Sequence, residues 1–273
     1  MHDASDHNSR PVRTLSRGYQ GAVLRVLRAD DHEIRIVDRL LLTANILRLT
    51  FESTTLLAAH QPFASFWVRL WFPDPSGDGR AHQRAYTIVG AEPDAGRFAL
   101  EFLLHDPAGP ASAWAKRAEV GEGLIATVYG SRPVSAGAAR RLLVADLAAW
   151  PAARELAEQI RADGAEVRTV VALLPGERAA AAAVIDGADP TVQWVEDDTR
   201  GDMVAAAVAA HAAWADDVWL AGEAGRLKAV RRALKASGGP GKKEITASAY
   251  WISGRSMGRI GEAVDDELRD TRS

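Results

Sequence analysis

The pattern of the sequence changes near Gly130, and this change constrains the fold more than any other feature. Before it, short β-type runs alternate with turn-forming stretches rich in Pro, Gly and Asp. After it, apolar runs alternate with alanine-rich amphipathic segments of helical length. The first pattern predicts a small antiparallel barrel or sandwich, and the second predicts a doubly wound parallel sheet with helices, so the fold class is α/β with a β-barrel.

The expected elements follow directly from these two patterns. In the first part, six strands are expected at Ile34–Val37, Asn45–Phe51, Ser65–Phe72, Arg84–Val89, Phe98–Leu104 and Leu124–Tyr129. In the second part, five strands are expected at Arg141–Ala145, Val167–Leu174, Thr191–Val195, Asp217–Ala221 and Ile245–Trp251, with helices near Ala152–Ala162, Glu177–Ile185, Gly201–Trp214 and Gly225–Ala236.

Three regions follow from this reading. Residues 1–18 are polar and are expected to form a disordered tail, because they offer too little apolar surface to offset the entropy of ordering. Residues 19–136 form the predicted barrel domain. Residues 137–273 form the α/β domain, which ends in an acid-rich helix near 262–270.

Composition excludes several classes of chemistry. The chain has 273 residues and no cysteine, which excludes disulfides, thiolate nucleophiles and cysteine-ligated metal centres. Its seven histidines show no ligand spacing, so no protein-bound metal is expected. Any redox chemistry must therefore come from a bound organic cofactor or from a metal in the substrate.

Charge and hydropathy bear on partners and location. The formal charge is −3 and the 33 Lys and Arg residues form no basic tract, so nucleic acid is not an expected partner. No run approaches the roughly 18 apolar residues of a membrane span, and the polar start lacks the apolar centre of a signal peptide. We expect a cytoplasmic protein.

The first chemically informative cluster is Arg84-Ala85-Tyr86-Thr87, at a predicted strand after a turn. Arginine offers a fork of donors to a phosphate, tyrosine offers a flat ring, and threonine offers a hydroxyl. Strand alternation places Arg84 and Tyr86 on one face, so one ligand could contact both. Taken alone, the four residues are better described as a surface arginine beside a half-buried strand tyrosine, because short motifs often match by chance.

The second cluster joins His105 to Gly109-Pro110-Ala111-Ser112 and Trp114, between a predicted strand and a short helix. Proline suits the first turn of a helix, glycine allows a ligand close to the backbone, and the amides near Ala111 and Ser112 could face a pyrophosphate. The Ser112 hydroxyl adds a donor. The alternative is a plain helix start with Trp114 in the core.

Together these clusters resemble the flavin signature of the siderophore-interacting proteins, Arg-x-Tyr-Thr followed by His-x-x-x-Gly-Pro-Ala-Ser-x-Trp-Ala. The resemblance continues in Val144–Ala152, which is similar to the family's Gly-Asp-Glu-Thr-Ala-Leu-Pro-Ala turn. It extends to Trp219–Ala224 and to Tyr250-Trp251 with Gly254.

The resemblance implies a six-stranded FAD-binding barrel and a reductase-like α/β domain. It further implies reduction of the iron(III) of a ferric siderophore, with electrons from NAD(P)H or a small ferredoxin-like carrier. The cofactor residues that it indicates are Arg84, Tyr86, Thr87, His105, Gly109, Pro110, Ala111, Ser112, Trp114, Asp146, Glu223 and Trp251.

Several positions depart from the family pattern. Val89 stands where a second arginine is common, which removes a contact to a phosphate or an anionic substrate. Leu147 and Ala148 replace an acid and a hydroxyl in the turn where a nicotinamide donor would approach. We therefore expect direct reduction by NAD(P)H to be slow and poorly selective between the two nicotinamides.

The substrate is expected to be an anionic iron complex bound by basic residues. Arg132, after the last barrel strand, and Arg255, after the Tyr250–Gly254 segment, are the candidates, with Lys242 and Lys243 as an alternative pair. Ordinary loop arginines are an equally good description of these positions.

Two other functions remain open from the sequence. One keeps the flavin but uses it in biosynthetic or non-reductive chemistry, and the departures at Val89, Leu147 and Ala148 motivate it. The other is a non-enzymatic siderophore-binding module with an empty flavin cleft. An absorption spectrum separates the binding module from the two flavin-containing alternatives. Flavin reduction by NAD(P)H separates the reductase from the repurposed enzyme.

Overall fold

The computed structural model describes residues 15–134, 137–179, 181 and 189–254, in two compact units. The first unit comprises residues 1–132 and the second residues 133–273. The division falls after Arg132. Each unit is described by itself.

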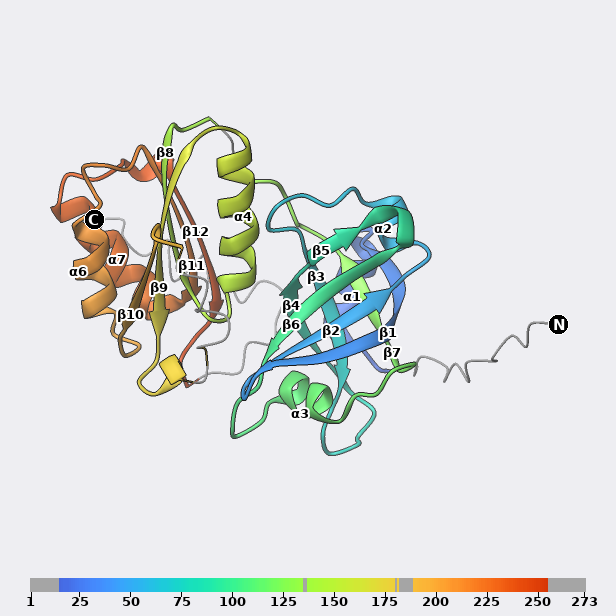
Figure 1. Cartoon of the computed structure of the whole chain (residues 1–273). Coiled ribbons are helices and arrows are strands. Elements are labelled where there is room, and N and C mark those ends of the chain that lie inside the picture. The colour runs from blue at the N-terminus through green and yellow to red at the C-terminus, as the bar shows by residue number, and fades with distance from the viewer. Residues whose placement is uncertain (1–14, 135–136, 180, 182–188, 255–273) are drawn as a thin grey trace. The chain divides into compact units, whose positions relative to one another are not determined.

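The first unit is a curved antiparallel sheet of seven strands, with the order β4-β3-β7-β1-β2-β6-β5 (Figure 1). Alternating apolar residues place one face of each strand in a common core. Three short helices accompany the sheet: α1 (Gly18–Val26), α2 (Leu56–Ala59) and α3 (Pro110–Arg117). The strands are β1 (Asp30–Thr43), β2 (Ile46–Glu52), β3 (Trp67–Pro73), β4 (Ala81–Thr87), β5 (Val89–Glu92), β6 (Arg97–Leu103) and β7 (Gly123–Val128).

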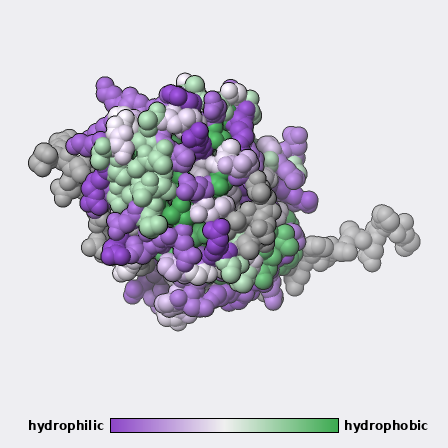
Figure 2. Space-filling model, turned by 60° about the vertical axis from the view of Figure 1, so that its left-hand side comes forward, coloured by the Kyte–Doolittle hydropathy of each residue, from purple (hydrophilic) through white to green (hydrophobic). Residues whose placement is uncertain are grey.

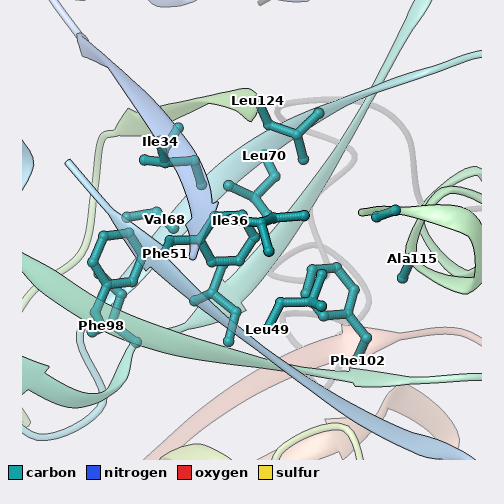
Figure 3. Close-up of a cluster of buried hydrophobic side chains, with 14 of the residues drawn as sticks. Ile34, Ile36, Leu49, Phe51, Val68, Leu70, Phe98, Phe102, Ala115 and Leu124 are labelled. Carbon is teal, nitrogen blue, oxygen red and sulfur yellow. The ribbon is translucent and has the colours of Figure 1, made fainter. Parts of the chain in front are cut away.

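The core of this unit is formed by aliphatic and aromatic side chains from all sides of the curved sheet (Figure 3). Phe51 and Phe98, from paired strands, stack with ring centroids 5.9 Å apart. Ala115 of α3 reaches the same core and is fully buried. Closing the sheet over this core fixes where β4 and α3, the two predicted flavin-binding elements, lie.

The structure adds several elements to those predicted for the first unit, among them α1, α2 and β5. The six expected strands are present, and β5 is a seventh that directly follows β4. The helix α1 begins at Gly18, at the end of the segment expected to be a disordered tail. The described residues of that segment make contacts with the sheet: Ser16 pairs with Arg80, and the Arg17 guanidinium lies 5.0 Å from the centre of the Trp71 ring. These contacts stabilise a segment whose own apolar content is low.

The second unit is a parallel five-stranded sheet with the order β10-β9-β8-β11-β12, as the strand and helix alternation predicts. In Figure 1, α4 lies on one side of this sheet and α6 and α7 lie on the other. The strands are β8 (Arg140–Asp146), β9 (Glu166–Leu173), β10 (Val192–Glu196), β11 (Asp217–Glu223) and β12 (Ile245–Trp251), and the helices are α4 (Trp150–Ala162), α6 (Asp202–Ala209) and α7 (Ala224–Ala236).

Valine, leucine and alanine form the core between this sheet and the pair α6 and α7. Central strands that are buried on both faces explain the continuous apolar run Leu142–Ala145, which is at most 2% exposed. The helix α6 ends at Ala209, earlier than the predicted Trp214. The expected C-terminal helix near 262–270 lies outside the described residues.

Hydrophilic residues dominate the face drawn in Figure 2, and apolar residues occur there in smaller groups. Large apolar side chains that are exposed include Tyr19 and Val26 on α1 and Met203 on α6. Among the residues described, no helix is both long and apolar enough to cross a membrane.

Candidate functional site

The first part of the candidate site is built on β4, where the antiparallel pairing with β3 sets Arg84 opposite Leu70 and Tyr86 opposite Val68. Both side chains are half-buried and lie close enough to interact electrostatically, as strand alternation predicts. Burial lowers the pKa of the Arg84 guanidinium, and the neighbouring Tyr86 opposes this effect. A partly desolvated arginine of this kind is a strong donor to an anion.

Tyr86 joins β4 to an aromatic cluster at the edge of the core. Its ring centroid lies 4.4 Å from that of Phe102 on β6 and 6.0 Å from that of Phe72 on β3. Trp114 of α3 contacts both phenylalanines, with centroids 5.5 and 6.1 Å away. Burial raises the pKa of the Tyr86 hydroxyl well above its ordinary value. The ring therefore stays neutral and rigidly held at physiological pH.

The helix α3 begins as the sequence predicts, with Gly109 as its extended N-cap residue and Pro110 in the first turn. A helix leaves its first amides without intrahelical partners, and here those amides belong to Ala111 and Ser112. A methyl group at Gly109 would meet nothing nearer than the His105 ring, at 3.7 Å. That is an ordinary van der Waals distance, and a phosphate bound before the helix would meet these backbone donors.

Ser112 and His105 make hydrogen bonds within the loop before α3 that the sequence did not indicate. The Ser112 hydroxyl accepts the His105 amide at 3.2 Å and itself contacts the His105 carbonyl at 3.4 Å. The exposed His105 ring donates from Nδ1 to the Pro107 carbonyl at 2.8 Å. Ser112 thus holds the loop before α3 in place, and Trp114, 5% exposed, is a core side chain.

These residues fit FAD. Donors for a diphosphate at the start of α3, an arginine fork and a supported flat ring lie on elements that share one aromatic cluster. Thr87 is buried at the end of β4, and Val89, where the family commonly has an arginine, is buried in β5 and pairs with Ala99. A groove of about 670 Å³ in this unit lies instead beside α1, and Trp114 is the one predicted flavin residue among those that line it.

The second part of the site lies at the carboxyl ends of the parallel strands in the second unit. It brings together Asp146 of β8, Glu223 of β11 and Trp251 of β12. Asp146 Oδ2 accepts the Trp251 Nε1–H at 2.7 Å and the Glu223 amide at 3.0 Å. Asp146 and Glu223 are 4% and 3% exposed, so both carboxylates are engaged inside the protein.

Sequence reasoning missed the cation of this cluster, Arg226 on α7, which is 2% exposed. Its Nη1 lies 3.4 Å from Asp146 Oδ2, and its Nη2 donates to the Asp198 carbonyl at 3.2 Å. Burial raises the pKa of Asp146, and Arg226 and the hydrogen bonds oppose this. Gly222, at φ +138°, provides the room, because a methyl group there would meet Asp146 Oδ2 at 2.5 Å. Gly222, a glycine near the end of an apolar strand, was the sequence signal that could have indicated this close contact.

The chain's own carboxylates accept hydrogen bonds from amides near the starts of α4, α6 and α7. Asp146 accepts the Ala149 amide before α4, at 3.1 Å. Asp197 accepts the Val204 amide in α6, and Glu223 accepts the Arg226 amide in α7, both at 2.8 Å. A dinucleotide pyrophosphate binds such amides in doubly wound domains. At these three helix starts, a pyrophosphate would have to displace a carboxylate of the protein itself.

The predicted substrate residues belong to different units of the chain. Arg132 is exposed in the first unit, at the end of the chain segment that follows β7. Lys242 and Lys243 precede β12, at the amino edge of the sheet, and Arg255 lies outside the described residues. Within the described ranges, no group of three or more acidic or histidine side chains is arranged to hold a metal ion.

Comparison with known proteins matches both units. Residues 138–254 match the family model described as siderophore-interacting protein, and residues 74–128 match the siderophore-interacting FAD-binding domain. The mycobactin import ATP-binding/permease protein IrtA of Mycolicibacterium thermoresistibile is 35% identical over 252 residues, which are 89% of this chain and 27% of that protein. The protein of the same name from Mycobacterium tuberculosis is 33% identical over 258 residues. The chain thus spans just over a quarter of these relatives, 27% and 28%.

Solved structures share the fold. A siderophore utilization protein from T. fusca superposes with a TM-score of 0.66 at 23% identity and covers 84% of this chain and 95% of its own. The siderophore-interacting protein SipS from Aeromonas hydrophila gives 0.65 at 23% identity, with 84% and 94% covered. The ferredoxin reductase of carbazole 1,9a-dioxygenase gives 0.62 at 17% identity, with 82% and 68% covered. The barrel followed by a parallel α/β unit is therefore the fold of ferredoxin-reductase-like flavoproteins.

Proposed function

The chain belongs to the siderophore-interacting protein family and binds FAD, and we propose from this that it reduces the iron(III) of a ferric siderophore to iron(II). The observation that carries the proposal is the convergence of β4 and the start of α3 on one aromatic cluster. The cluster links β4, which carries Arg84 and Tyr86, to α3, which carries the amides of Ala111 and Ser112. The proposed site of reaction is the cytoplasm.

The chemistry explains why reduction would release the metal. Hard oxygen donors bind iron(III) far more tightly than the softer iron(II). FAD, when bound, supplies two electrons, so one reduced cofactor accounts for two iron(III) ions. The roles of the chain are to bind the cofactor and to support its ring beside Tyr86. It needs no general base, in keeping with a sequence that lacks a Ser-His-Asp arrangement.

A spectrum is the first test of the proposal. The purified protein is expected to be yellow, with the absorption bands of a non-covalent flavin that heat or acid releases as FAD. A colourless protein that fails to bind added FAD would instead favour a non-enzymatic siderophore-binding module.

The electron donor is the next question, and we predict that NAD(P)H reduces the flavin slowly and with little preference between NADH and NADPH. The amides of Ala149, Val204 and Arg226 are already bonded to carboxylates, and the Arg226 side chain is buried against Asp146. Leu147 and Ala148 add no polar group in the same turn. A small ferredoxin-like carrier is the alternative donor.

Anaerobic stopped-flow measurement of flavin bleaching checks this prediction, with dithionite as the control that the flavin is reducible. Fast bleaching with a strong preference for NADPH would contradict it, and would direct attention to Lys228 near the start of α7.

For the substrate, we propose an anionic iron complex such as a ferric tris-catecholate, with Arg132 and Arg255 as its contacts. Iron(III) tris-catecholates carry net negative charge, which exposed arginines attract most strongly at low salt. Arg132→Ala and Arg255→Ala should therefore slow reduction of an anionic siderophore at low salt. They should leave a neutral hydroxamate complex unaffected. Equal losses on both substrates, or no loss on either, would rule out these two contacts.

A further inference from the structure

A second groove, of about 560 Å³, lies at the amino ends of β9 and β10, at the opposite sheet edge from the Asp146 cluster. The end of α4 and the segment after α6 complete its walls. Its volume is in the range of small-molecule sites. The proposed reductase function makes no use of it.

The groove contains a stacked arginine. The Arg168 guanidinium carbon lies 4.2 Å from the centre of the Trp214 ring, which is a cation–π contact. Arg168 Nη1 lies 3.2 Å from His211 Nδ1, and since arginine has only donors, Nδ1 accepts. The proton of the neutral ring is then on Nε2, which faces Gln193 Oε1 at 3.4 Å. These contacts fix the plane of the guanidinium.

Among the described residues, Arg168 forms no ion pair with an acid. Arg140, Arg141 and Arg161 of the same unit pair with Asp216, Asp217 and Asp189. In the described part of the chain, the contacts of Arg168 are a neutral imidazole and an indole face. Burial and the charge of Arg168 lower the pKa of His211, so at neutral pH the histidine adds no charge.

Thr169, 1% exposed, also lines the groove and has a buried hydroxyl that lacks a hydrogen-bond partner among the described residues. Because it is the next residue of β9, its side chain points to the opposite face of the sheet from Arg168, and the hydroxyl is not part of the arginine site. The other charged groups of the groove are Glu166 on β9 and Arg161 at the end of α4, the latter already paired with Asp189.

We propose that this groove binds a small organic anion, with a carboxylate or phosphate group on the Arg168 guanidinium beside His211 and Trp214. A planar fork of donors with a fixed orientation is suited to bidentate binding of such a group. Binding would place a negative charge next to His211 and offset the charge of Arg168. All residues that line this groove belong to the second unit.

Histidine NMR tests the proposal without any measure of activity. The pKa of His211, identified with His211→Gln, is measured in the FAD-bound protein with phosphate or citrate and compared with chloride at matched ionic strength. Either anion should raise this pKa in a saturable manner, and the tighter of the two identifies the preferred group. Arg140→Met, in which the replaced arginine has its own aspartate, should behave like the unmodified protein.

Arg168→Met should weaken binding at least about ten-fold, which corresponds to the loss of one charged hydrogen-bonding group. Should that variant not fold, Arg168→Lys retains the charge without the fork and should also bind more weakly. The proposal is overturned if neither anion shifts the pKa of His211, if the shift persists in Arg168→Met, or if Arg168→Lys binds as tightly as the unmodified protein.

Discussion

Replacing Arg226 with methionine is expected to destabilise the α/β unit by about 3–5 kcal/mol, the cost of breaking a buried ion pair. The substitution keeps much of the side-chain volume but removes the guanidinium that pairs with Asp146. Asp146 would retain the amides of Ala149 and Glu223 and the Trp251 ring N–H, so the lower end of the range is the better expectation. Chemical denaturation of the second unit measures the loss.

The pH dependence separates lost charge from lost packing. Burial already raises the folded-state pKa of Asp146 and of Glu177 above their ordinary values of 3.8 and 4.5. A raised folded pKa gives stability that is present below the unfolded pKa and is lost as pH rises through the folded pKa. Arg226→Met should raise the pKa of Asp146 further, so the loss of stability that this substitution causes should become smaller on mild acidification.

The matched control is Arg232→Met, which removes an exposed arginine from the same helix. Its effect is expected within about 0.5 kcal/mol, as for ordinary surface positions. An Arg226→Met deficit as small as this, or one independent of pH, would contradict the assignment of a buried charge pair.

The second large effect is on the cofactor: Arg84→Ala should weaken FAD binding about ten- to a hundred-fold, because a charged hydrogen bond contributes about 1.5–3 kcal/mol. Arg84 is half-buried beside Tyr86, where its charge is less screened than at an exposed position. Titration of the apoprotein with FAD, followed by flavin fluorescence, gives the affinity.

Two companion variants make the test specific. Arg97→Ala removes an exposed barrel arginine paired with Glu52, and it should leave FAD affinity unchanged. Gly109→Ala places a methyl group at an ordinary distance from His105, so the apoprotein should stay stable while FAD binding weakens. Full FAD affinity in both Arg84→Ala and Gly109→Ala would show that the cofactor binds elsewhere.

Residue periodicity predicted most of the fold, because each strand and helix carries its own apolar pattern. The elements that it missed are stabilised by distant parts of the chain. The strand β5 is only four residues long, and α1 contains Gly18 and Gly21, which lower helix propensity. Ser16 pairing with Arg80 and Arg17 packing on Trp71 stabilise that segment, and neither contact is visible in the local sequence.

The candidate site was predicted unevenly for the same reason. Arg84 with Tyr86, and Gly109 with Pro110, are neighbours in sequence, and the structure arranges them as their local patterns indicate. Asp146, Glu223 and Trp251 come from strands far apart in the chain. Only the register of β8, β11 and β12 shows that they bond to one another and enclose Arg226.

The most direct test of the proposed function is anaerobic oxidation of the reduced flavoprotein by a ferric siderophore. The FAD in the protein is reduced with dithionite, excess reductant is removed, and ferric tris-catecholate or ferric hydroxamate is added with an iron(II) indicator. The flavin absorbance is predicted to return as the iron(II) signal appears, with two iron(II) ions formed per flavin and faster than with free reduced FAD. A flavin that stays reduced, or iron(II) formed no faster than with free reduced FAD, would contradict a ferric-siderophore reductase.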